Sequence, residues 1–320
     1  MTTARTVPVT TEMDGDELDA EDAWHLVRRH GIRRVLVESF VRFRYGDGFT
    51  NSRALAFQTC LAVVPFMLAV TGLAADIDDE RWANVVAATV NAIAPGQGSD
   101  DALAAAADGS ERSGEIALTF GLLFALVSMT TAMAQVERGT NRIYGIRRDR
   151  PALWKYGRAA IFTTLLAGPV GTGFLLLVGG QAFGDAMVSE GVWSETAETW
   201  CDALRWPLGL VLLVFAIAVL LDHAPRRRQP ALSWLALGSI IAVLLSMVAT
   251  GGLAAYVTVS ASFSSTYGPL AGIFVLLLWS QLSAIAVFFG AAVCAQLEAL
   301  RARAGEPVYD DPGRPHEQIV

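Results

Sequence analysis

The chain has 320 residues, of which 53% are hydrophobic and only 17% are charged, and its mean hydropathy is +0.43. Soluble proteins carry about 25% charged residues, so this composition excludes a disordered chain and indicates a protein with much surface shielded from water. The net charge of −7 and the isoelectric point near 5.2 argue against a general nucleic-acid binder.

Six apolar runs of sixteen residues or more lack Asp, Glu, Lys and Arg. A helix that spans a membrane needs about 20 mostly apolar residues, and the fourth run, which is short, would be completed by Trp193–Arg205. The sequence therefore predicts an all-α polytopic membrane protein with six transmembrane helices over residues 54–294 and short amphipathic interfacial helices. The runs are Ala54–Ala75, Ile116–Val136, Ala159–Gly180, Trp206–Leu221, Ala231–Val259 and Pro269–Cys294.

Lysine and arginine are concentrated in every second segment outside these runs. The segments 1–53, 137–158, 222–231 and 295–320 hold 21 of them, and the three alternate segments hold two. Because loops rich in Lys and Arg stay inside, both termini are expected to be cytoplasmic in a multi-pass protein of the cell inner or plasma membrane. The cytoplasmic segments sum to +4 and the outer ones to −11, so the net charge of −7 is the difference between two opposed faces.

The segments outside the runs have patterns of their own. Residues 1–20 are expected to form a disordered N-terminal tail without a cleaved signal peptide. Residues 295–320 are expected to form a cytoplasmic C-terminal tail that is disordered from residue 305 onward. Residues 21–53 predict a cytoplasmic amphipathic basic helix, with arginines around an apolar stripe that suits anionic headgroups. The stripe is formed by Ile32, Leu36, Phe40 and Phe43, and the arginines are Arg28, Arg29, Arg33, Arg34, Arg42 and Arg44.

Two further amphipathic helices are predicted on the outer side. Apolar residues from Trp82 to Ile93 recur at helical spacing, and Pro95-Gly96 would end that helix. This helix would pack on the bundle or lie at the outer interface. A second helix would begin with Ser99 as its N-cap.

Proline and glycine interrupt several runs. Transporters use such breaks to build binding sites within the membrane, but kinks and close helix packing are the simpler interpretation. Polar residues inside the runs, such as Gln135 and Thr250, should face inward, where they form hydrogen bonds between helices or line a cavity. The breaks are Pro65, Gly168, Pro169, Gly268, Pro269 and Gly272.

The densest polar cluster follows the second run. Arginine binds phosphate through two hydrogen bonds from its planar guanidinium group, so a headgroup site is chemically reasonable. The excess of Lys and Arg that is usual in cytoplasmic loops explains the number of arginines equally well, but it does not explain Asn141 and Tyr144. The cluster comprises Glu137, Arg138, Asn141, Arg142, Tyr144, Arg147, Arg148, Arg150, Lys155 and Arg158.

Catalytic signatures are not found in the sequence. The carboxylates near the cytoplasmic ends of the runs are Glu137, Asp149 and Asp222, beside His223, and the three cysteines form no metal-binding or disulfide pattern. We therefore expect no enzyme, no metal and no cofactor, with a membrane-associated hydrolase or nuclease as the disfavoured alternative.

Three blocks of residues resemble the YihY/virulence factor BrkB family of membrane proteins. The first is Arg53-Ala54-Leu55-Ala56-Phe57 with Pro65-Phe66, and the second is Asn141-Arg142-Ile143-Tyr144-Gly145 with Arg150. The third is Tyr267-Gly268-Pro269-Leu270-Ala271-Gly272, followed by Leu278-Trp279 and Gly290-Ala291-Ala292. One departure is Gln58-Thr59-Cys60-Leu61, where relatives commonly have a tyrosine and then a Leu-Ser pair.

This resemblance implies a six-helix inner-membrane protein whose molecular activity is not established and whose relatives were once labelled ribonuclease BN. We expect a protein that transports or binds a lipid-like or small solute, and a non-transporting scaffold for envelope assembly or surface resistance is the alternative. The expected partners are membrane lipids, including anionic phospholipid headgroups on the cytoplasmic side, and no nucleic acid, with a homo-oligomer left open. The candidate binding residues, as polar anchors at the ends of the spans, are Arg53, Asn141, Tyr144, Arg150 and Tyr267.

Overall fold

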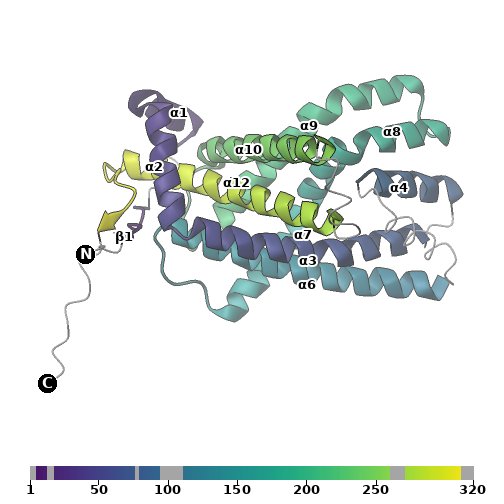
Figure 1. Ribbon diagram of the computed structural model, residues 1–320, viewed down its shortest axis with the longest axis horizontal. Helices are drawn as coiled ribbons and strands as arrows, with labels where there is room; N and C mark the ends of the chain where they lie inside the picture. Colours follow the sequence, from purple (N-terminus) through teal and green to yellow (C-terminus); the bar gives the residue numbers. More distant parts are fainter. Residues whose placement is uncertain (1–4, 13–17, 76–78, 94–110, 260–270, 311–320) are drawn as a thin grey trace. The chain divides into compact units, whose positions relative to one another are not determined.

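The computed structural model describes residues 5–12, 18–75, 79–93, 111–259 and 271–310 (Figure 1). These residues are helical apart from connecting segments and one antiparallel pair of short strands, β1 (Arg5–Thr6) and β2 (Tyr309–Asp310). The helices are α1 (Ala20–His30), α2 (Ile32–Tyr45), α3 (Gly48–Ala75), α4 (Glu80–Ile93), α6 (Glu111–Ile143), α7 (Ala152–Phe174), the π-helix η2 (Leu175–Gly179), α8 (Gly180–Ser189), α9 (Glu195–His223), α10 (Leu232–Val259) and α12 (Ala271–Arg301). The predicted all-helical class is confirmed.

Five segments of the described chain are long and apolar enough to cross a membrane. Only 11% to 33% of the residues in their most apolar windows are buried, so most of these side chains are at least partly exposed. A water-soluble protein rarely exposes so much contiguous apolar surface. The five segments are Leu118–Ile143, Ala152–Ser189, Glu195–His223, Leu232–Val259 and Ala271–Arg301, and they contain or closely match the second to sixth predicted runs.

The first predicted run lies inside α3, which is one continuous helix. This helix is not among the five segments, and part of its side chains lies outside the described residues. A sixth spanning helix therefore stays a prediction. The short fourth run is extended as expected, because α9 begins at Glu195.

The chain divides into two compact units. The first comprises residues 1–57, 133–155 and 217–320, and the second comprises residues 58–132 and 156–216.

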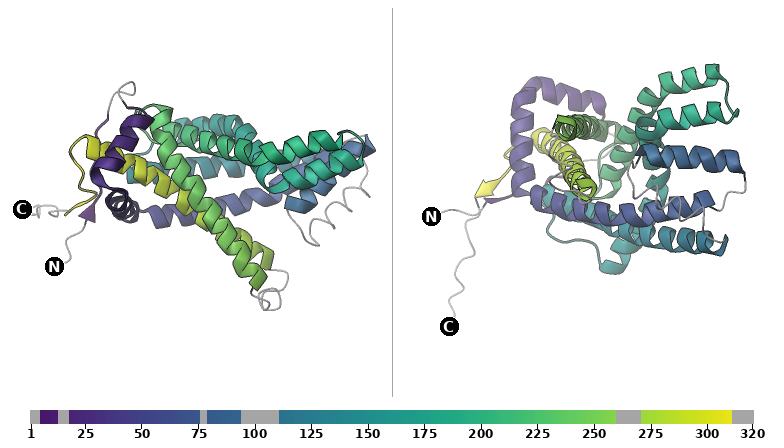
Figure 2. Two further views of the ribbon diagram at one scale, coloured as in Figure 1. Left: turned by 90° about the horizontal axis from the view of Figure 1, so that it is seen from above. Right: turned by 45° about the vertical axis from the view of Figure 1, so that its right-hand side comes forward.

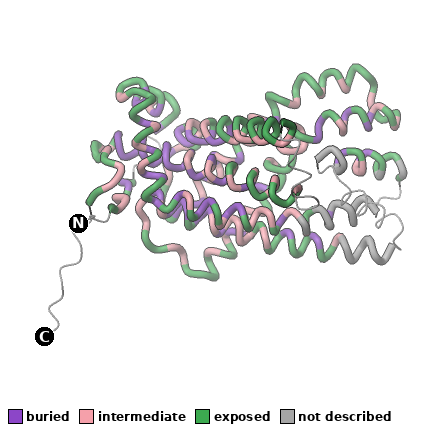
Figure 3. Tube along the Cα trace, viewed as in Figure 1, coloured by how far each residue is buried: buried purple, intermediate pink, exposed green. Residues whose placement is uncertain are grey.

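The core of the first unit is the C-terminal half of α12. Every residue from Gly290 to Leu300 is buried, and α1, α2 and α10 pack around this helix (Figure 3). α10 approaches it closely at Gly238, where an added Cβ would lie 2.5 Å from the carbonyl oxygen of Gly290. Backbone contact of this kind needs glycine on both helices.

The predicted helix over residues 21–53 is in fact two helices and the beginning of a third. Gly31 has a φ of +83°, which favours glycine, and it separates α1 from α2 at the sharp corner visible in Figure 2. Asp19 caps α1 by accepting hydrogen bonds from the backbone N–H groups of Glu21 and Asp22.

The expectation of disordered tails is wrong for parts of both ends of the chain. β1 pairs with β2, so that Arg5 lies opposite Asp310 and Thr6 opposite Tyr309. Leu18 is also fully buried. The low hydrophobicity of these segments predicted disorder, but contacts with the first unit's core hold them in place.

The second unit contains the predicted outer helix. α4 packs on α8 and η2, and its Val85 is buried in a cluster with Ala186 and Met187. Figure 1 shows α4 beside α8. The second helix predicted from Ser99, like Pro95 and Gly96, lies outside the described residues.

The predicted helix breaks have different outcomes. Pro65 lies inside α3 and Pro169 inside α7, and both helices continue past the proline. An added Cβ on Gly168 or Gly272 would meet no atom of the described chain within 4 Å, so neither glycine provides close packing there. Gly268 and Pro269 lie outside the described residues.

Candidate functional site

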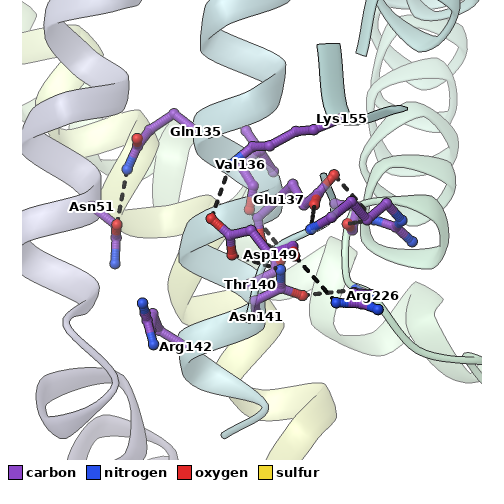
Figure 4. A network of polar contacts seen from close by, with 12 residues as sticks. Asn51, Gln135, Val136, Glu137, Thr140, Asn141, Arg142, Asp149, Lys155 and Arg226 are labelled. Atoms are coloured by element: carbon purple, nitrogen blue, oxygen red, sulfur yellow. Dashed lines mark hydrogen bonds and ion pairs between the residues drawn. The ribbon is translucent and has the colours of Figure 1, made fainter. Parts of the chain in front are cut away.

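The C-terminal end of α6 holds polar residues on two different faces. Gln135, Arg138 and Arg142 follow one another at spacings of three and four, which places them on one side of the helix. Glu137 and Asn141 lie on a second, neighbouring face of the same helix. The first set faces α3 and the second faces the loops that join the helices, as Figure 4 shows for Asn141 and Arg142.

A buried ionic cluster lies between the end of α6, α12 and the segment before α10. Nη2 of Arg227 lies 2.7 Å from Oε2 of Glu298, and the guanidinium group stacks 4.7 Å from the centre of the Tyr144 ring. The phenol of Tyr144 donates a hydrogen bond of 3.2 Å to the other carboxylate oxygen of Glu298. Burial, together with the charge of Glu298, raises the pKa of Tyr144, which therefore stays protonated and can donate this bond.

Arg42 joins the same cluster from α2. Its Nε donates to Oε1 of Gln296 at 3.1 Å, and its Nη1 donates to Thr10 and to the carbonyl oxygen of Ile143. Burial lowers the pKa of Arg42 to about 10, so the group remains charged at neutral pH. The prediction that Arg42 belongs to the exposed basic face is wrong, because its side chain is fully buried.

A second network fixes the loop between α6 and α7 (Figure 4). The amide of Asn141 donates to Oδ1 of Asp149 at 3.0 Å and accepts from the backbone N–H of Arg226 at 2.7 Å. Lys155 binds the other oxygen of Asp149 at 3.0 Å. Partial burial raises the pKa of Asp149, but the hydrogen bonds from Asn141 and Lys155 outweigh it and hold the pKa below its usual value.

Arg150 ties this loop to the one after α9. Its Nη1 lies 3.0 Å from the carboxylate of Glu137, and its guanidinium donates to the carbonyl oxygens of Ala224 and Pro225. Because it meets three groups in fixed positions, Arg150 orders the segment that also carries Arg226 and Arg227.

The N-terminal segment covers the ionic cluster. Thr10 donates its backbone N–H to the carbonyl oxygen of Tyr144 at 3.0 Å, and the carbonyl oxygen of Thr11 accepts a hydrogen bond from Arg227. The backbone of Pro8 lies so close to Gly145 that a Cβ there would be 2.6 Å from the carbonyl carbon of Pro8, and Gly145 also has a φ of +79°. Only glycine fits this position without strain.

A polar cavity of about 260 Å³ opens between the first turns of α3 and the last turns of α6. Its walls carry two arginines and one carboxylate, and its end nearest the apolar runs is formed by Ala54 and Gln135. The lining residues are Asp47, Thr50, Asn51, Ala54, Gln135, Arg138 and Arg142.

The structure brings three of the five candidate residues into the first unit's internal contacts. Asn141 and Tyr144 are fully buried, and Arg150 is bonded as described above. Arg53 is exposed on α3, and Tyr267 lies outside the described residues. Their role in binding a solute stays a prediction.

Sequence reasoning missed Arg42, Arg227 and Glu298 as a group. They lie far apart in the chain, and each occurs where arginine or glutamate is ordinary surface charge, so no local pattern marks them. Gly145, in the second resemblance block, was a usable signal, because it marks the turn that Pro8 covers.

Among the described residues, no three His, Cys, Asp or Glu side chains are grouped so that they could hold a metal ion. Glu137 and Asp149 are held by the partners described above. Oδ2 of Asp222 lies 2.9 Å from Nδ1 of His223.

Comparisons with known proteins identify the family of the chain. Residues 39–311 match the family model of virulence factor BrkB. The chain is 25% identical to a ribonuclease-like protein, YfkH, of Bacillus subtilis (strain 168), over 86% of this chain and 98% of that protein. It is 28% identical to the UPF0761 membrane protein Smlt0865 of Stenotrophomonas maltophilia (strain K279a), over 89% of this chain and 66% of the relative.

A third relative, the UPF0761 membrane protein azo3165 of Azoarcus sp. (strain BH72), is 25% identical over 81% of this chain and 63% of its own length. The chain thus spans about two thirds of these UPF0761 relatives. No solved structure matches the chain. Since the family model covers most of the sequence and five helical segments could cross a membrane, the chain belongs to the BrkB family of membrane proteins.

Proposed function

We propose that this protein crosses the inner or plasma membrane six times, with both termini in the cytoplasm, and that it binds a lipid-like or small solute and moves it across the bilayer. The observation that carries the proposal is the close association, in the first unit, of arginine-lined polar helix ends with outward-facing apolar side chains. Ala54 lines the polar cavity, and Phe57, one turn further along α3, is 59% exposed.

Such a boundary suits a molecule that is polar at one end and apolar at the other. Guanidinium groups bind an anionic headgroup, while exposed apolar side chains meet its hydrocarbon part. The charge distribution supports the orientation, because the basic segments would lie on the cytoplasmic side, where anionic lipids are enriched.

The test is a translocation assay in vesicles. The full chain is reconstituted with a fluorescent phospholipid, and a membrane-impermeant reductant reports how fast label leaves the protected leaflet. We expect faster exchange than in protein-free vesicles. Equal rates with folded protein present would contradict transport of this class of solute.

Among the five candidate residues, Arg53 gives the cleanest variant. It is exposed, so Arg53→Ala should leave the fold intact, whereas alanine at Asn141 or Tyr144 removes buried contacts. If the Arg53→Ala protein folds in a normal amount but translocates lipid more slowly, the predicted role of Arg53 as a polar anchor is supported. An unchanged rate would contradict that role.

The alternatives predict different outcomes. A scaffold for envelope assembly would give no translocation, but deletion of the protein would change surface resistance. A hydrolase would give Mg²⁺-dependent activity that is lost when Glu137, Asp149 or Asp222 is changed. Both carboxylates described above, Glu137 and Asp149, are occupied by Arg150 and by Asn141 and Lys155, which favours a structural role for them.

A further inference from the structure

The cavity between α3 and α6 carries cationic groups and an anionic group in one small space. Arg138 is exposed, and its side chain makes no hydrogen bond or ion pair with the rest of the described chain. In the side chain of Arg142, only Nη1 donates a hydrogen bond within the described chain, to the carbonyl oxygen of Arg147 at 3.1 Å. The guanidinium N–H groups left over belong to two residues one helical turn apart, so they can reach one ligand together.

We propose that this cavity binds the phosphodiester of a phospholipid headgroup that also carries an amine, as in an ethanolamine phospholipid. This inference rests on the proposed function and names the headgroup at its polar end. Arg138 and Arg142 hold the phosphate, and Asp47 holds the ammonium group.

The arginines account for the phosphate. A planar guanidinium group presents paired donors that match two oxygens of a phosphate, and two such groups more than balance the single negative charge of a phosphodiester. The cavity also lies at the first turn of α3, which lines it at Thr50, and the positive end of that helix dipole favours an anion there.

Asp47 accounts for the amine. Its carboxylate would repel a simple anion, but a headgroup with a cationic end satisfies the carboxylate and the arginines at once. Asp47 has a φ of +57°, and its carbonyl oxygen already accepts hydrogen bonds from the backbone N–H and the amide of Asn51. These bonds fix the backbone, and the carboxylate of Asp47, an exposed residue that lines the cavity, has no hydrogen bond or ion pair with the rest of the described chain.

The size and position fit a headgroup without its acyl chains. Pockets that enclose whole small ligands measure roughly 300 to 1,000 Å³, so about 260 Å³ suits a small polar group. The cavity also ends at Ala54, where the first apolar run begins, and Gln135, one residue before the second run ends. Acyl chains attached to the phosphate would continue along those runs.

The walls are held together without the ligand. The Gln135 amide donates to Oδ1 of Asn51 at 2.8 Å, which links α6 to α3 across the cavity (Figure 4). A bound headgroup therefore meets a preformed site, and little binding energy is lost in ordering it.

The test is calorimetric titration of the full chain in a neutral maltoside detergent. The probes are three soluble short-chain lipids, dihexanoyl phosphatidylethanolamine, phosphatidylglycerol and phosphatidylcholine, and also inorganic phosphate. Arg138→Gln and Arg142→Gln should each weaken binding of the ethanolamine lipid by about tenfold. Arg148→Gln, which removes an exposed arginine from outside the cavity, should not change it.

Asp47→Asn tests the amine. Asparagine tolerates the left-handed backbone conformation, so the fold should be kept, which the thermal unfolding temperature checks. Binding of the ethanolamine lipid should fall about tenfold, whereas binding of the glycerol lipid should stay or rise. A choline lipid, whose quaternary ammonium group has no N–H to donate, should bind more weakly than the ethanolamine lipid.

Three outcomes would overturn the proposal. These are unchanged binding in Arg138→Gln and Arg142→Gln, an equal loss of both lipids in Asp47→Asn, or inorganic phosphate binding as tightly as the lipids. The result is independent of translocation. If the headgroup binds but lipid is not exchanged, the binding site is supported and transport is contradicted. If lipid is exchanged but the headgroup does not bind at this cavity, transport is supported and the binding site is contradicted.

Discussion

Arg227 and Glu298 form an ion pair of 2.7 Å inside the first unit, where their side chains are only 2% and 0% exposed. Arg42 and Tyr144 complete the group around them. Arg227 thus pairs with the carboxylate in a place that water does not reach, and Tyr144 satisfies the second oxygen of that carboxylate, while Arg42 bonds the neighbouring Gln296, Thr10 and Ile143. A charge group of this kind tolerates little change, since each member compensates for the burial of another.

Replacing Glu298 by Gln should therefore destabilise the protein strongly. The substitution leaves Arg227 charged and buried beside a neutral amide, and removing one member of a buried pair costs about 3–5 kcal/mol. Thermal unfolding of the purified protein in detergent measures the effect. Glu306→Gln, which changes an exposed carboxylate, should unfold like the wild type. Equal unfolding temperatures for both variants would contradict the role of the ion pair.

The contact between α10 and α12 gives a second prediction. A Cβ on Gly290 would lie 2.5 Å from the carbonyl oxygen of Gly238, so Gly290→Ala should force the helices apart and cost about 1–3 kcal/mol. Gly251→Ala is the control, because an added Cβ there meets no described atom within 4 Å. That substitution should be neutral or slightly stabilising. If both variants unfold at the same temperature, the close packing is not needed.

The lowered pKa of Asp149 predicts a dependence of stability on pH. A carboxylate whose pKa is lower in the folded state stabilises the protein above its unfolded value, about 3.9, and loses this contribution as the pH falls through the folded value. Asp149→Asn should therefore lower the unfolding temperature at pH 7, and the difference from the wild type should shrink below about pH 4. A difference that stays constant from pH 7 to pH 3 would contradict this.

The six-span topology predicts where an introduced cysteine can be labelled. Thr196→Cys lies in the segment expected outside, and Arg148→Cys lies in one expected inside. Both positions are exposed, and Cys201→Ser removes the natural cysteine of the outer segment. In intact cells, a membrane-impermeant maleimide should label the cysteine at 196 alone and should reach the one at 148 only after permeabilisation. The reverse pattern would invert the topology.

The helices were predictable because apolar runs and charge position are local properties of the sequence. The second to sixth runs match the five segments, and Trp82 to Ile93 lies within α4. The ends of the helices were predicted less well. The sixth run was expected to end at Cys294, but α12 continues to Arg301. Its last turns, rich in alanine and leucine, are stabilised by burial against α1 and α2.

The sites depended on contacts that no local pattern encodes. Arg138 and Arg142 were predicted as part of a basic cluster that suits phosphate, and both line the cavity. Asp47 and Asn51 were not predicted as site residues, because only the approach of α3 to α6 makes them neighbours of these arginines. Arg42 was assigned to the surface, because helical spacing does not show that Gln296 and Thr10 cover it.

A lipid translocation assay tests whether this membrane protein takes up an amphiphilic molecule by its phosphate at the α3–α6 cavity. Vesicles containing wild-type protein should exchange a labelled ethanolamine phospholipid faster than protein-free vesicles, Arg148→Gln should match the wild type, and Arg138→Gln should be slower by about tenfold. Equal rates for wild-type and protein-free vesicles would contradict transport, and equal rates for wild type and Arg138→Gln would contradict uptake at this cavity.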